Sequence, residues 1–281
     1  MAKKNNCGII GQGFVGFNLK TVLLERGCIV NTYDVLTEKS SCESIEELTR
    51  KTKLIFVCVP TPMQHSGECD TSIVEGILEE LNKCCEQHTI VIKSTITVGS
   101  TKEFQKRFKF LNLVFSPEFL REATALEDMR NQDRIILGGE RVSGVETFFK
   151  EMFPNVPILK TDASTAEMVK YATNCFLATK VLFFNEVFQV CEKLNIDYNK
   201  IPELLSYDDR IGKTHLQVPG PDKHFAIGGS CFVKDLNAFK WLAKSLDIDP
   251  KICDSVWKKT LELRPERDWE QLIGRAVVGD E

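Results

Sequence analysis

The sequence predicts an α/β protein in which a Rossmann-like, doubly wound parallel sheet is followed by an all-α helical domain. Short β-rich segments alternate with helical segments in the first half of the chain, and this alternation is typical of a parallel sheet covered by helices on both faces. After about residue 160 only helical patterns remain. We therefore expect an N-terminal domain over residues 1–162 and a helical domain over residues 163–281.

The expected strands are short and apolar, with little polar alternation, which suits burial on both faces of a sheet. They are Cys7–Ile10, Ile29–Asp34, Leu54–Val59, Thr89–Ser94, Leu113–Ser116 and Arg134–Gly138. Apolar residues at helical spacing predict helices between the first four strands, over Val15–Arg26, Ser44–Lys51 and Thr71–Cys85.

The helical domain is expected to begin with a long helix that runs from Ser164 to about Leu194. Its first residues, Ser-Thr-Ala-Glu at 164–167, predict a capping box in which the side chains of Ser164 and Glu167 each accept the other residue's amide. Residues 176–184 are apolar nearly all round, so we expect them to be buried against several partners. Further helices are predicted near residues 235–246 and from Asp249-Pro250 onward.

Composition and charge exclude several classes of protein. The 281 residues are 43% apolar and 27% charged, as in an ordinary globular protein. The net charge of −4, with no block of Lys and Arg, gives no reason to expect a nucleic-acid partner. No apolar run approaches the ~20 residues that cross a bilayer, and the first residues do not resemble a signal peptide, so we expect a cytoplasmic protein without a membrane partner.

Cysteine usage favours a reducing compartment. The chain has eleven cysteines, an odd number, and no CxxC pair. We therefore predict neither disulfides nor a metal site, and we expect most of these thiols to be small core residues.

A glycine-rich string, GQGFVG at residues 11–16, follows the first expected strand and opens a helix. Gly11 permits a tight turn, Gly13 lets backbone amides approach a pyrophosphate, and Gly16 allows close packing of helix and strand. The second expected strand ends in Asp34, 18 residues after Gly16, where a carboxylate can hold ribose hydroxyls. Because Asp34 would repel a 2′-phosphate and the next two residues are uncharged, NAD is expected rather than NADP.

Three further segments end at the carboxyl edge of expected strands, where ligands of open α/β sheets bind. They are VPTP at 59–62, KST at 93–95 and SPEFLRE at 116–122. Lys170 and Asn174 lie four residues apart and therefore share one face of the long helix. Taken singly, these polar side chains could equally belong to a solvated surface.

The string GGSCFVKD at 228–235 places a cysteine in a distinctive setting. Cys231 follows small residues, which give access, and precedes a Lys-Asp pair, whose cation would favour the thiolate. By itself Cys231 could also be a packing thiol. A DRIG string at 209–212 precedes this segment.

Together these segments resemble the UDP-glucose/GDP-mannose dehydrogenase family. PEFLRE at 117–122 and the GGSCFxKD pattern at 228–235 are much more specific to that family than the dinucleotide-binding string. The resemblance implies a fold like that of 6-phosphogluconate dehydrogenase and a nucleotide-sugar substrate, with UDP-glucose expected, whose C6 alcohol is oxidised with NAD to the carboxylate. It also implies a homodimer joined through the helical domain.

The resemblance further implies roles for single residues. Cys231 is the expected nucleophile, and Lys170 and Asn174 would stabilise negative charge on the substrate oxygen. The remaining catalytic residues would be Asp235 and Thr95, which position or activate a water, and Glu118 and Glu122, which assist the later hydrolysis. The implied cofactor contacts are Gly11, Gly13, Phe14, Val15, Gly16, Asp34, Lys39, Pro60, Thr61, Thr95, Glu122 and Lys234. The implied substrate contacts are Phe119, Leu120, Arg121, Lys170, Asn174, Gly228 and Arg210, the last of which would reach a neighbouring subunit.

The chain departs from the family pattern at several positions. Residues 226–229 read Ala-Ile-Gly-Gly where the family has GFGG, so the side chain of Ala226 is expected to narrow that loop. Ser116 and Ala123 flank PEFLRE where Asn and Gly are usual. Family members usually continue into a second Rossmann-like domain that grips the nucleotide. We expect that domain to be absent, because no strand–helix alternation follows the helical region.

Two other functions remain open at this point. A two-electron dehydrogenase resembling the 6-phosphogluconate or hydroxyisobutyrate enzymes would also use a Lys and an Asn, but it would not need Cys231. A non-catalytic NAD-binding partner of a full-length dehydrogenase would retain the glycines and Asp34, but it would have little reason to keep the catalytic residues together.

The ribose site generates a first testable prediction. We expect NAD to bind much more tightly than NADP, because Asp34 repels a 2′-phosphate and Val35 and Leu36 offer no positive charge to accept it. Titration calorimetry with both dinucleotides measures the ratio. Equal affinities, or a preference for NADP, would contradict this interpretation of Asp34.

Overall fold

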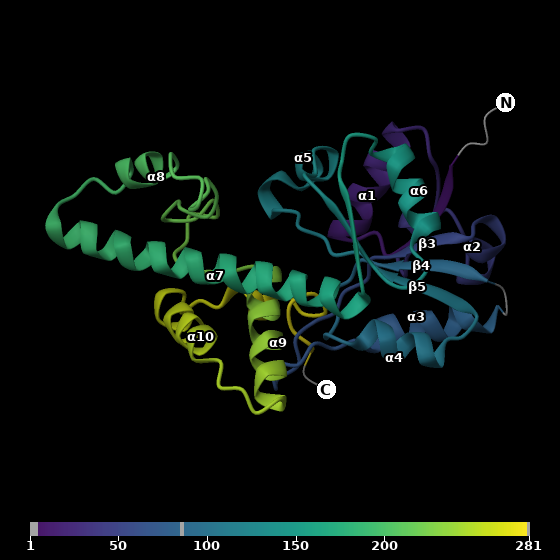
Figure 1. The fold of residues 1–281 in the computed structure, drawn as a ribbon. Coiled ribbons are helices and arrows are strands. Elements are labelled where there is room, and N and C mark those ends of the chain that lie inside the picture. Colours follow the sequence, from purple (N-terminus) through teal and green to yellow (C-terminus); the bar gives the residue numbers. More distant parts are fainter. Residues whose placement is uncertain (1–4, 85–86, 280–281) are drawn as a thin grey trace. The chain divides into compact units, whose positions relative to one another are not determined.

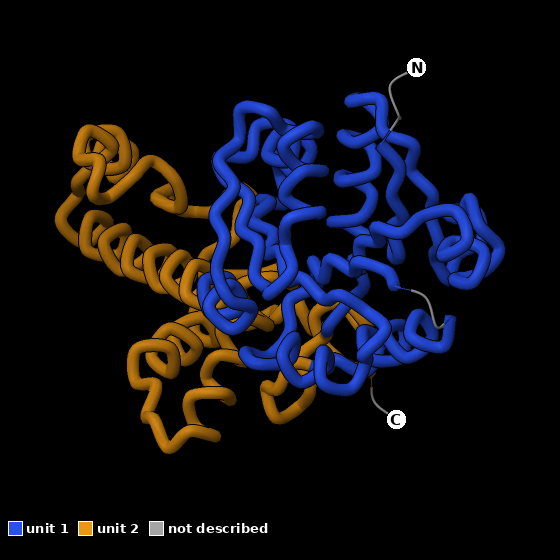
Figure 2. Tube along the Cα trace, turned by 45° about the vertical axis from the view of Figure 1, so that its right-hand side comes forward, with its two compact units in different colours: residues 1–61, 70–170 blue, residues 62–69, 171–281 orange. Residues whose placement is uncertain are grey.

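The computed structural model describes residues 5–84 and 87–279, and it divides the chain into two compact units (Figure 2). The first unit comprises residues 1–61 and 70–170, and the second comprises residues 62–69 and 171–281. The segment 62–69 therefore belongs with the helical part of the chain, although it lies between two strands in the sequence. Cys85, the last residue of one predicted helix, lies outside the described residues.

The first unit is built on one seven-stranded sheet with the order β2-β1-β3-β4-β5-β6-β7. Its strands are β1 (Asn6–Ile10), β2 (Ile29–Tyr33), β3 (Leu54–Val57), β4 (His88–Ile92), β5 (Leu111–Phe115), β6 (Ile135–Gly138) and β7 (Ile158–Thr161). Every neighbouring pair is parallel except β5 and β6. The prediction of a Rossmann-like sheet is confirmed.

Two strands at one edge of the sheet differ from the prediction. β6 runs antiparallel to β5, with Phe115 opposite Gly138. The sequence could not predict this, because the apolar pattern that indicates a strand carries no information on its direction. β7 was missed. Its two middle residues, Leu159 and Lys160, are exposed, so the segment lacks the continuous apolar run by which buried strands are found.

Helices cover both faces of the sheet, as the strand–helix alternation predicted (Figure 1). Alternate residues of β3 show how the strands serve both sides, because Phe56 packs in one hydrophobic cluster and Ile55 and Val57 pack in the other. The cluster around Phe56 is completed by α1 (Phe14–Glu25), α5 (Ala125–Arg130) and α6 (Ser143–Met152). The opposite cluster is completed by α2 (Ile45–Lys51), α3 (Ser72–Lys83), α4 (Ser100–Arg107) and the first turns of α7 (Ala163–Leu194).

The second unit is mainly helical and has its own core. Its helices are α7 from residue 171 onward, α8 (Lys200–Leu205), α9 (Cys231–Ser245) and α10 (Lys251–Leu263). Leu182, Leu236 and Val256, from three of these helices, pack with the buried Trp269 near the end of the chain. The segment 62–69 is tied to the same region by the Met63 amide, which donates to the Ala276 carbonyl at 2.8 Å.

The start of α7 corrects the predicted capping box. The helix begins at Ala163, and Asp162 caps it by accepting both the amide and the hydroxyl of Thr165. Glu167 instead turns toward α4, where its carboxylate accepts the Gly99 amide at 2.5 Å and the Thr101 amide at 2.9 Å. The tertiary partner prevails because the α4 N-terminus has no side-chain cap of its own.

The middle of α7 corrects a second expectation. Phe176 and Phe183 were expected to be buried, but within this chain they are 66% and 58% exposed. Phe184, between other buried residues, is covered as expected. Among the described residues, no helix is both long enough and apolar enough to cross a membrane.

The contact between Glu167 and α4 can be tested by stability. Glu167→Ala should lower the free energy of unfolding by about 1–3 kcal/mol, because the buried Thr101 amide and the half-buried Gly99 amide lose their acceptor. Glu167→Gln should cost less, since one side-chain oxygen can still accept. Urea denaturation of both variants measures the difference.

Glu103→Ala provides the matched control, because Glu103 lies on α4 and forms an exposed ion pair with Lys106. Its loss should cost no more than about 0.5 kcal/mol. If Glu167→Ala is as stable as this control, the cap contributes nothing to the fold.

Candidate active site

The glycine-rich turn connects β1 to α1. A Cβ atom at Gly16 would lie 1.9 Å from the Gly11 carbonyl oxygen, so only glycine allows helix and strand to approach so closely here. Above Gly13, in contrast, a Cβ would meet nothing within 4 Å, and Gly13 is exposed. α1 has no side-chain cap, which leaves its first amides available to an anion.

Asp34 lies beside this turn, one residue after the end of β2 rather than within the strand as predicted. Its carboxylate accepts the Gln12 amide at 2.5 Å and the Leu36 amide at 2.9 Å. A carboxylate has further lone pairs that can accept ribose hydroxyls. The buried side-chain oxygen of Gln12 has no hydrogen-bond partner in the described part of the chain. These features fit a dinucleotide whose pyrophosphate lies over Gly13.

The other predicted cofactor contacts in this unit lie at the carboxyl edge of the sheet or in the first turn of α1. Phe14 and Val15 begin α1, and Lys39 is an exposed residue of the short η1 helix (Thr37–Lys39). Pro60 and Thr61 follow β3, with Thr61 buried, and Thr95 follows β4 and is half-buried.

A cluster of buried charges occupies the same unit. Lys93, Glu118 and Lys170 are all buried. The Lys170 ammonium donates to the Glu118 carbonyl, and the Lys93 ammonium donates to the Ser116 carbonyl at 3.1 Å. The Glu118 carboxylate accepts the amide of Leu120. The structure thus brings two predicted catalytic residues, Glu118 and Lys170, together.

Burial shifts the proton affinities of this cluster. It raises the pKa of the Glu118 carboxyl, an effect that the charges of Lys170 and Lys93 partly oppose. It lowers the pKa of Lys93, again against the opposing charge of Glu118. Opposite shifts of this kind bring an acid and a base closer to neutral pH. Lys93 was not among the predicted site residues, although a lysine directly after a buried strand was a signal that could have identified it.

The residues of the PEFLRE string that follow Glu118 differ in their surroundings. The Lys170 ammonium lies 5.5 Å from the centroid of the Phe119 ring. Phe119 and Leu120 pack against the two opposite hydrophobic clusters of the sheet. Arg121 forms an ion pair with Asp128 at 2.5 Å, and Glu122 is exposed at the start of the short η2 helix (Glu122–Thr124).

The predicted nucleophile lies in the second unit, at the first residue of α9. The sequence placed the start of this helix near residue 235, but the turn at Gly229, with a φ of +64°, lets it begin at Cys231. Among the cysteines that the structure describes, Cys231 alone is exposed. The N-terminus of a helix and a nearby cation both stabilise an anion.

A buried carboxylate organises the residues after Cys231. Asp235 is 1% exposed. One of its oxygens accepts the Asn174 side-chain amide, and the other accepts the Lys234 ammonium, both at 2.5 Å. Burial disfavours the charged form of Lys234, but Asp235, Cys69 and Cys231 outweigh that effect and raise its pKa. Lys234 therefore remains a cation near Cys231.

The two remaining predicted substrate contacts lie in loops of the second unit. Arg210 follows α8, and its side chain is 90% exposed and paired with Asp208. The Lys180 ammonium, on α7, donates to the carbonyls of Ile211 and Gly212. These bonds hold the last two residues of the DRIG string, directly after Arg210. Gly228 lies in the turn before α9.

Comparison with known proteins identifies the family to which this chain is similar. Residues 37–156 match the NAD binding domain of the UDP-glucose/GDP-mannose dehydrogenase family, and residues 164–259 match its central domain. The UDP-glucose 6-dehydrogenase of Rickettsia bellii is 37% identical over 230 residues, which cover 77% of this chain and 51% of that protein.

Solved structures show the same relationship. A UDP-glucose dehydrogenase from the archaeon Pyrobaculum islandicum has a TM-score of 0.81 at 27% identity, over 96% of this chain and 71% of that one. The 3-hydroxyisobutyrate dehydrogenase of Mycobacterium tuberculosis has a TM-score of 0.74 at 15% identity, over 94% and 95% of the two chains, and shares the fold alone.

A Rossmann-like sheet with an anion-binding glycine turn, joined to a helical unit, defines an NAD-binding protein of the dehydrogenase type. The chain belongs to the UDP-glucose/GDP-mannose dehydrogenase family, as the resemblance predicted. The family's NAD binding domain also confirms the prediction of NAD as cofactor. The chain spans about half the length of the curated relatives it matches.

The setting of Cys231 predicts selective alkylation. We expect iodoacetamide to modify Cys231 faster than any other cysteine, because it is exposed and lies at a helix N-terminus. Peptide mass spectrometry after short exposure measures the order of modification. The half-buried Cys84 is the internal comparison, and earlier modification of Cys84 would contradict the prediction.

Proposed function

We propose that this chain carries the catalytic residues of an NAD-dependent nucleotide-sugar dehydrogenase that oxidises the C6 alcohol of UDP-glucose to the carboxylate. The observation that carries the proposal is the exposed Cys231 at the start of α9, followed by the Lys234–Asp235–Asn174 hydrogen-bond network. A two-electron dehydrogenase would have no use for an accessible thiol. The names of the relatives supply the expected substrate.

In the first oxidation, the substrate loses a proton from its C6 hydroxyl and a hydride from C6. NAD, when bound, accepts the hydride. Lys170 and Asn174 stabilise the negative charge that develops on the oxygen. Asp235 and Thr95 orient the water that takes the proton. The Asn174 amide is held in place for this role by its bond to Asp235.

In the second oxidation, the Cys231 thiolate traps the aldehyde. Its sulfur forms a bond to C6, which gives a thiohemiacetal. Loss of the thiohemiacetal's hydroxyl proton to water and of a second hydride, which a second NAD would accept, gives a thioester. Water then attacks the carbonyl carbon, the carbon–sulfur bond breaks, and the acid and the thiol are released. Glu118 and Glu122 assist this hydrolysis as bases. The raised pKa of Glu118 suits proton transfer near neutral pH.

The covalent step distinguishes this function from the alternatives. With NAD and UDP-glucose, we expect two NADH per substrate consumed. Cys231→Ser should end the complete oxidation while NAD binding stays nearly unchanged, because a serine hydroxyl is a much weaker nucleophile than a thiolate and cannot form a thioester. Absorbance at the NADH band and calorimetry measure the two effects.

Cys253→Ser is the matched control, because Cys253 is a buried thiol of the same unit and should leave the stoichiometry at two. One NADH per substrate in the parent would favour the two-electron dehydrogenase. No turnover with any nucleotide sugar, together with firm NAD binding, would favour the non-catalytic partner.

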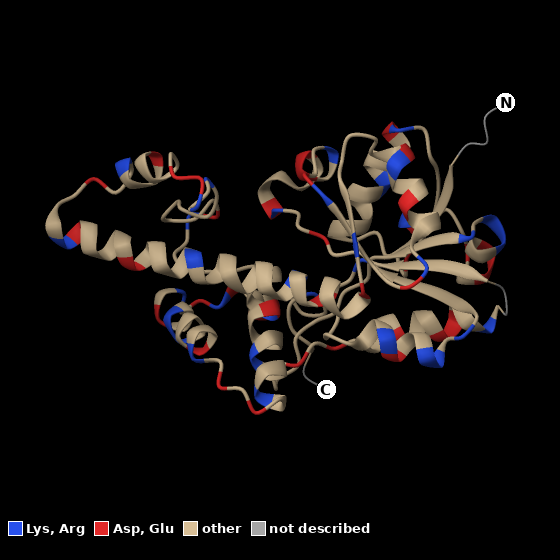
Figure 3. Cartoon of the chain, viewed as in Figure 1, with Lys and Arg blue, Asp and Glu red and all other residues tan. Residues whose placement is uncertain are grey.

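We also propose that the protein forms a homodimer through α7. Its exposed apolar residues Phe176, Phe183, Val190 and Leu194 follow spacings of seven and four, so they lie on one face of the helix. Charged residues are sparse along this part of α7 (Figure 3). Exposed apolar surface of this extent is typical of interfaces between subunits.

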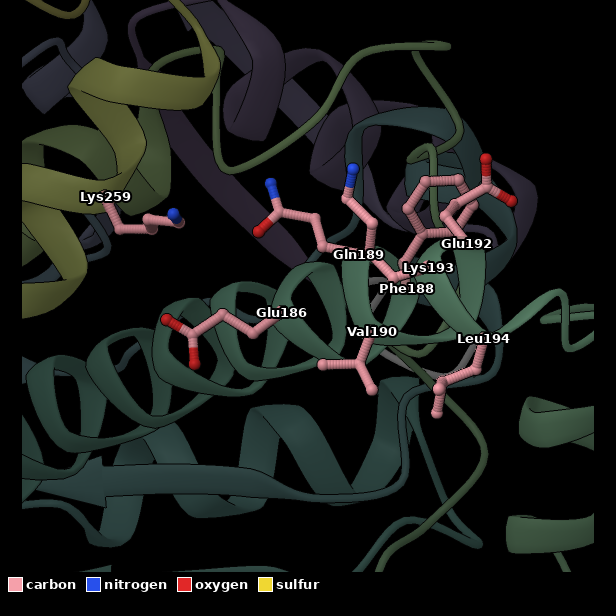
Figure 4. A pocket seen from close by; sticks show the side chains of 8 residues that line it. All are labelled: Glu186, Phe188, Gln189, Val190, Glu192, Lys193, Leu194 and Lys259. Carbon is pink, nitrogen blue, oxygen red and sulfur yellow. The ribbon is translucent and has the colours of Figure 1, made fainter.

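A groove continues this apolar face toward the end of α7 (Figure 4). It has a volume of about 680 Å³. It is lined by the apolar residues Phe188, Val190 and Leu194 together with polar and charged side chains, including Lys259 of α10. Protein–protein contacts likewise combine apolar and polar side chains.

Phe183→Glu should convert the dimer to a monomer, since it places a charge in the centre of the apolar face.

Arg210→Ala should lower activity without changing NAD binding, because the exposed Arg210 is proposed to serve the partner's substrate. Light scattering and a turnover assay measure these effects. Lys213→Ala is the exposed control from the same loop. A fully active parental monomer would contradict both parts of this proposal.

A further inference from the structure

The residues after α10 lie against the turn that precedes Cys231. The match to the family's central domain ends at residue 259, so these residues extend beyond it. Arg264 follows the last turn of α10 and is only 3% exposed. Its Nε donates to Asp268 Oδ1 at 2.6 Å, and its Nη1 lies 2.7 Å from Asp222 Oδ2. The guanidinium is therefore held by a hydrogen bond to Asp268 and an ion pair with Asp222, although in the described part of the chain Nη1 itself lacks a hydrogen bond.

Arg264 and Asp268 also contact the glycine turn at residues 228–229. The second oxygen of Asp268 accepts the Gly229 amide at 3.0 Å. The Arg264 guanidinium fills the space beside Gly228, where a Cβ atom would lie 2.1 Å from Cζ. Gly229 then leads, through Ser230, directly into the first turn of α9. Arg264 thus contacts Gly228, and Asp268 accepts the amide of Gly229, three and two residues before Cys231.

Burial of the Arg264 side chain restricts its movement away from the glycine turn. An arginine on the surface exchanges partners freely, and ion pairs there contribute little. A buried guanidinium must keep its carboxylates, because an uncompensated buried charge is costly. The side chain of Arg264 therefore cannot leave Gly228 without losing both ion pairs, and Asp268 stays aligned for the Gly229 amide.

We propose that Arg264 and Asp268 are positioning residues that fix the Gly228–Gly229 turn and thereby hold Cys231 at the N-terminus of α9, near Lys234. The proposal rests on the proposed function in treating Cys231 as the nucleophile. Cys231 is the first residue of α9 and lies three residues before Lys234, whose ammonium is paired with Asp235. If the turn loosens, the first residue of α9 is the first to leave the helix.

The experiment compares the rate of Cys231 alkylation at pH 7 with the rate at pH 9.5 in each variant. The ratio of the two rates reports the stabilisation of the thiolate, whereas mere exposure changes both rates alike. We expect Arg264→Met to lower this ratio about tenfold, since the thiolate loses its fixed environment. Asp268→Asn should lower it to a similar degree, and Arg264→Lys, which keeps the charge, should recover part of it.

The double variant Arg264→Met/Asp268→Asn should lower the rate ratio no further than either single variant, because both substitutions remove the same contact with the glycine turn. Arg267→Met is the matched control. Arg267 lies on the same segment and forms an exposed pair with Glu270, so the ratio should match the parent. Melting temperatures confirm that every variant is folded during the assay.

An unchanged rate ratio in folded Arg264→Met would overturn the proposal, as would equal loss of both rates, which marks a purely structural role. Parental turnover separates this result from the fate of the proposed function. If the parent oxidises UDP-glucose but the ratio is unaffected, only the positioning role fails. If the parent is inactive but the ratio falls as expected, the positioning role stands and the proposed function fails.

Discussion

The helical unit depends on the satisfaction of one buried carboxylate. Asp235 lies almost fully out of solvent, and an unpaired charge at such a site would cost several kcal/mol. Its two oxygens are used by donors of different kinds, the neutral amide of Asn174 on α7 and the ammonium of Lys234 on α9. The bond from Asn174, which helps to make the buried carboxylate tolerable, also joins α7 to α9 and orients the Asn174 amide. Structural and chemical requirements therefore coincide at this residue.

The sheet unit also contains buried charged groups, but there two lysines accompany one carboxylate. The charges of two ammonium groups, Lys93 and Lys170, act on the single carboxylate of Glu118, and each ammonium donates to a backbone carbonyl. Backbone acceptors are needed because one carboxylate cannot satisfy two cations. Burial then moves the pKa of Glu118 and the pKa of Lys93 toward each other.

Much of this arrangement follows from local sequence patterns. The first six strands and the glycine turn were predictable because apolar runs and GxGxxG express local backbone requirements. Contacts set by tertiary structure were not predictable in this way. Glu167 has the spacing of a capping box, yet it caps a different helix, and β6 has a clear strand pattern that does not specify its direction. Lys93 was passed over because a lysine is buried only where the fold supplies its acceptors.

The turn before α9 shows how a departure from the family pattern is accommodated. Ala226 adopts a φ of +59°, in the left-handed region that glycine enters more easily than alanine. Its amide donates to the side-chain oxygen of Asn185 at 3.0 Å, so α7 holds the backbone in that conformation. Gly228, two residues later, could not change in the same way, because Arg264 occupies the space of its side chain. The loop therefore accepts a substitution where a helix supports it and keeps glycine where a buried cation fills the gap.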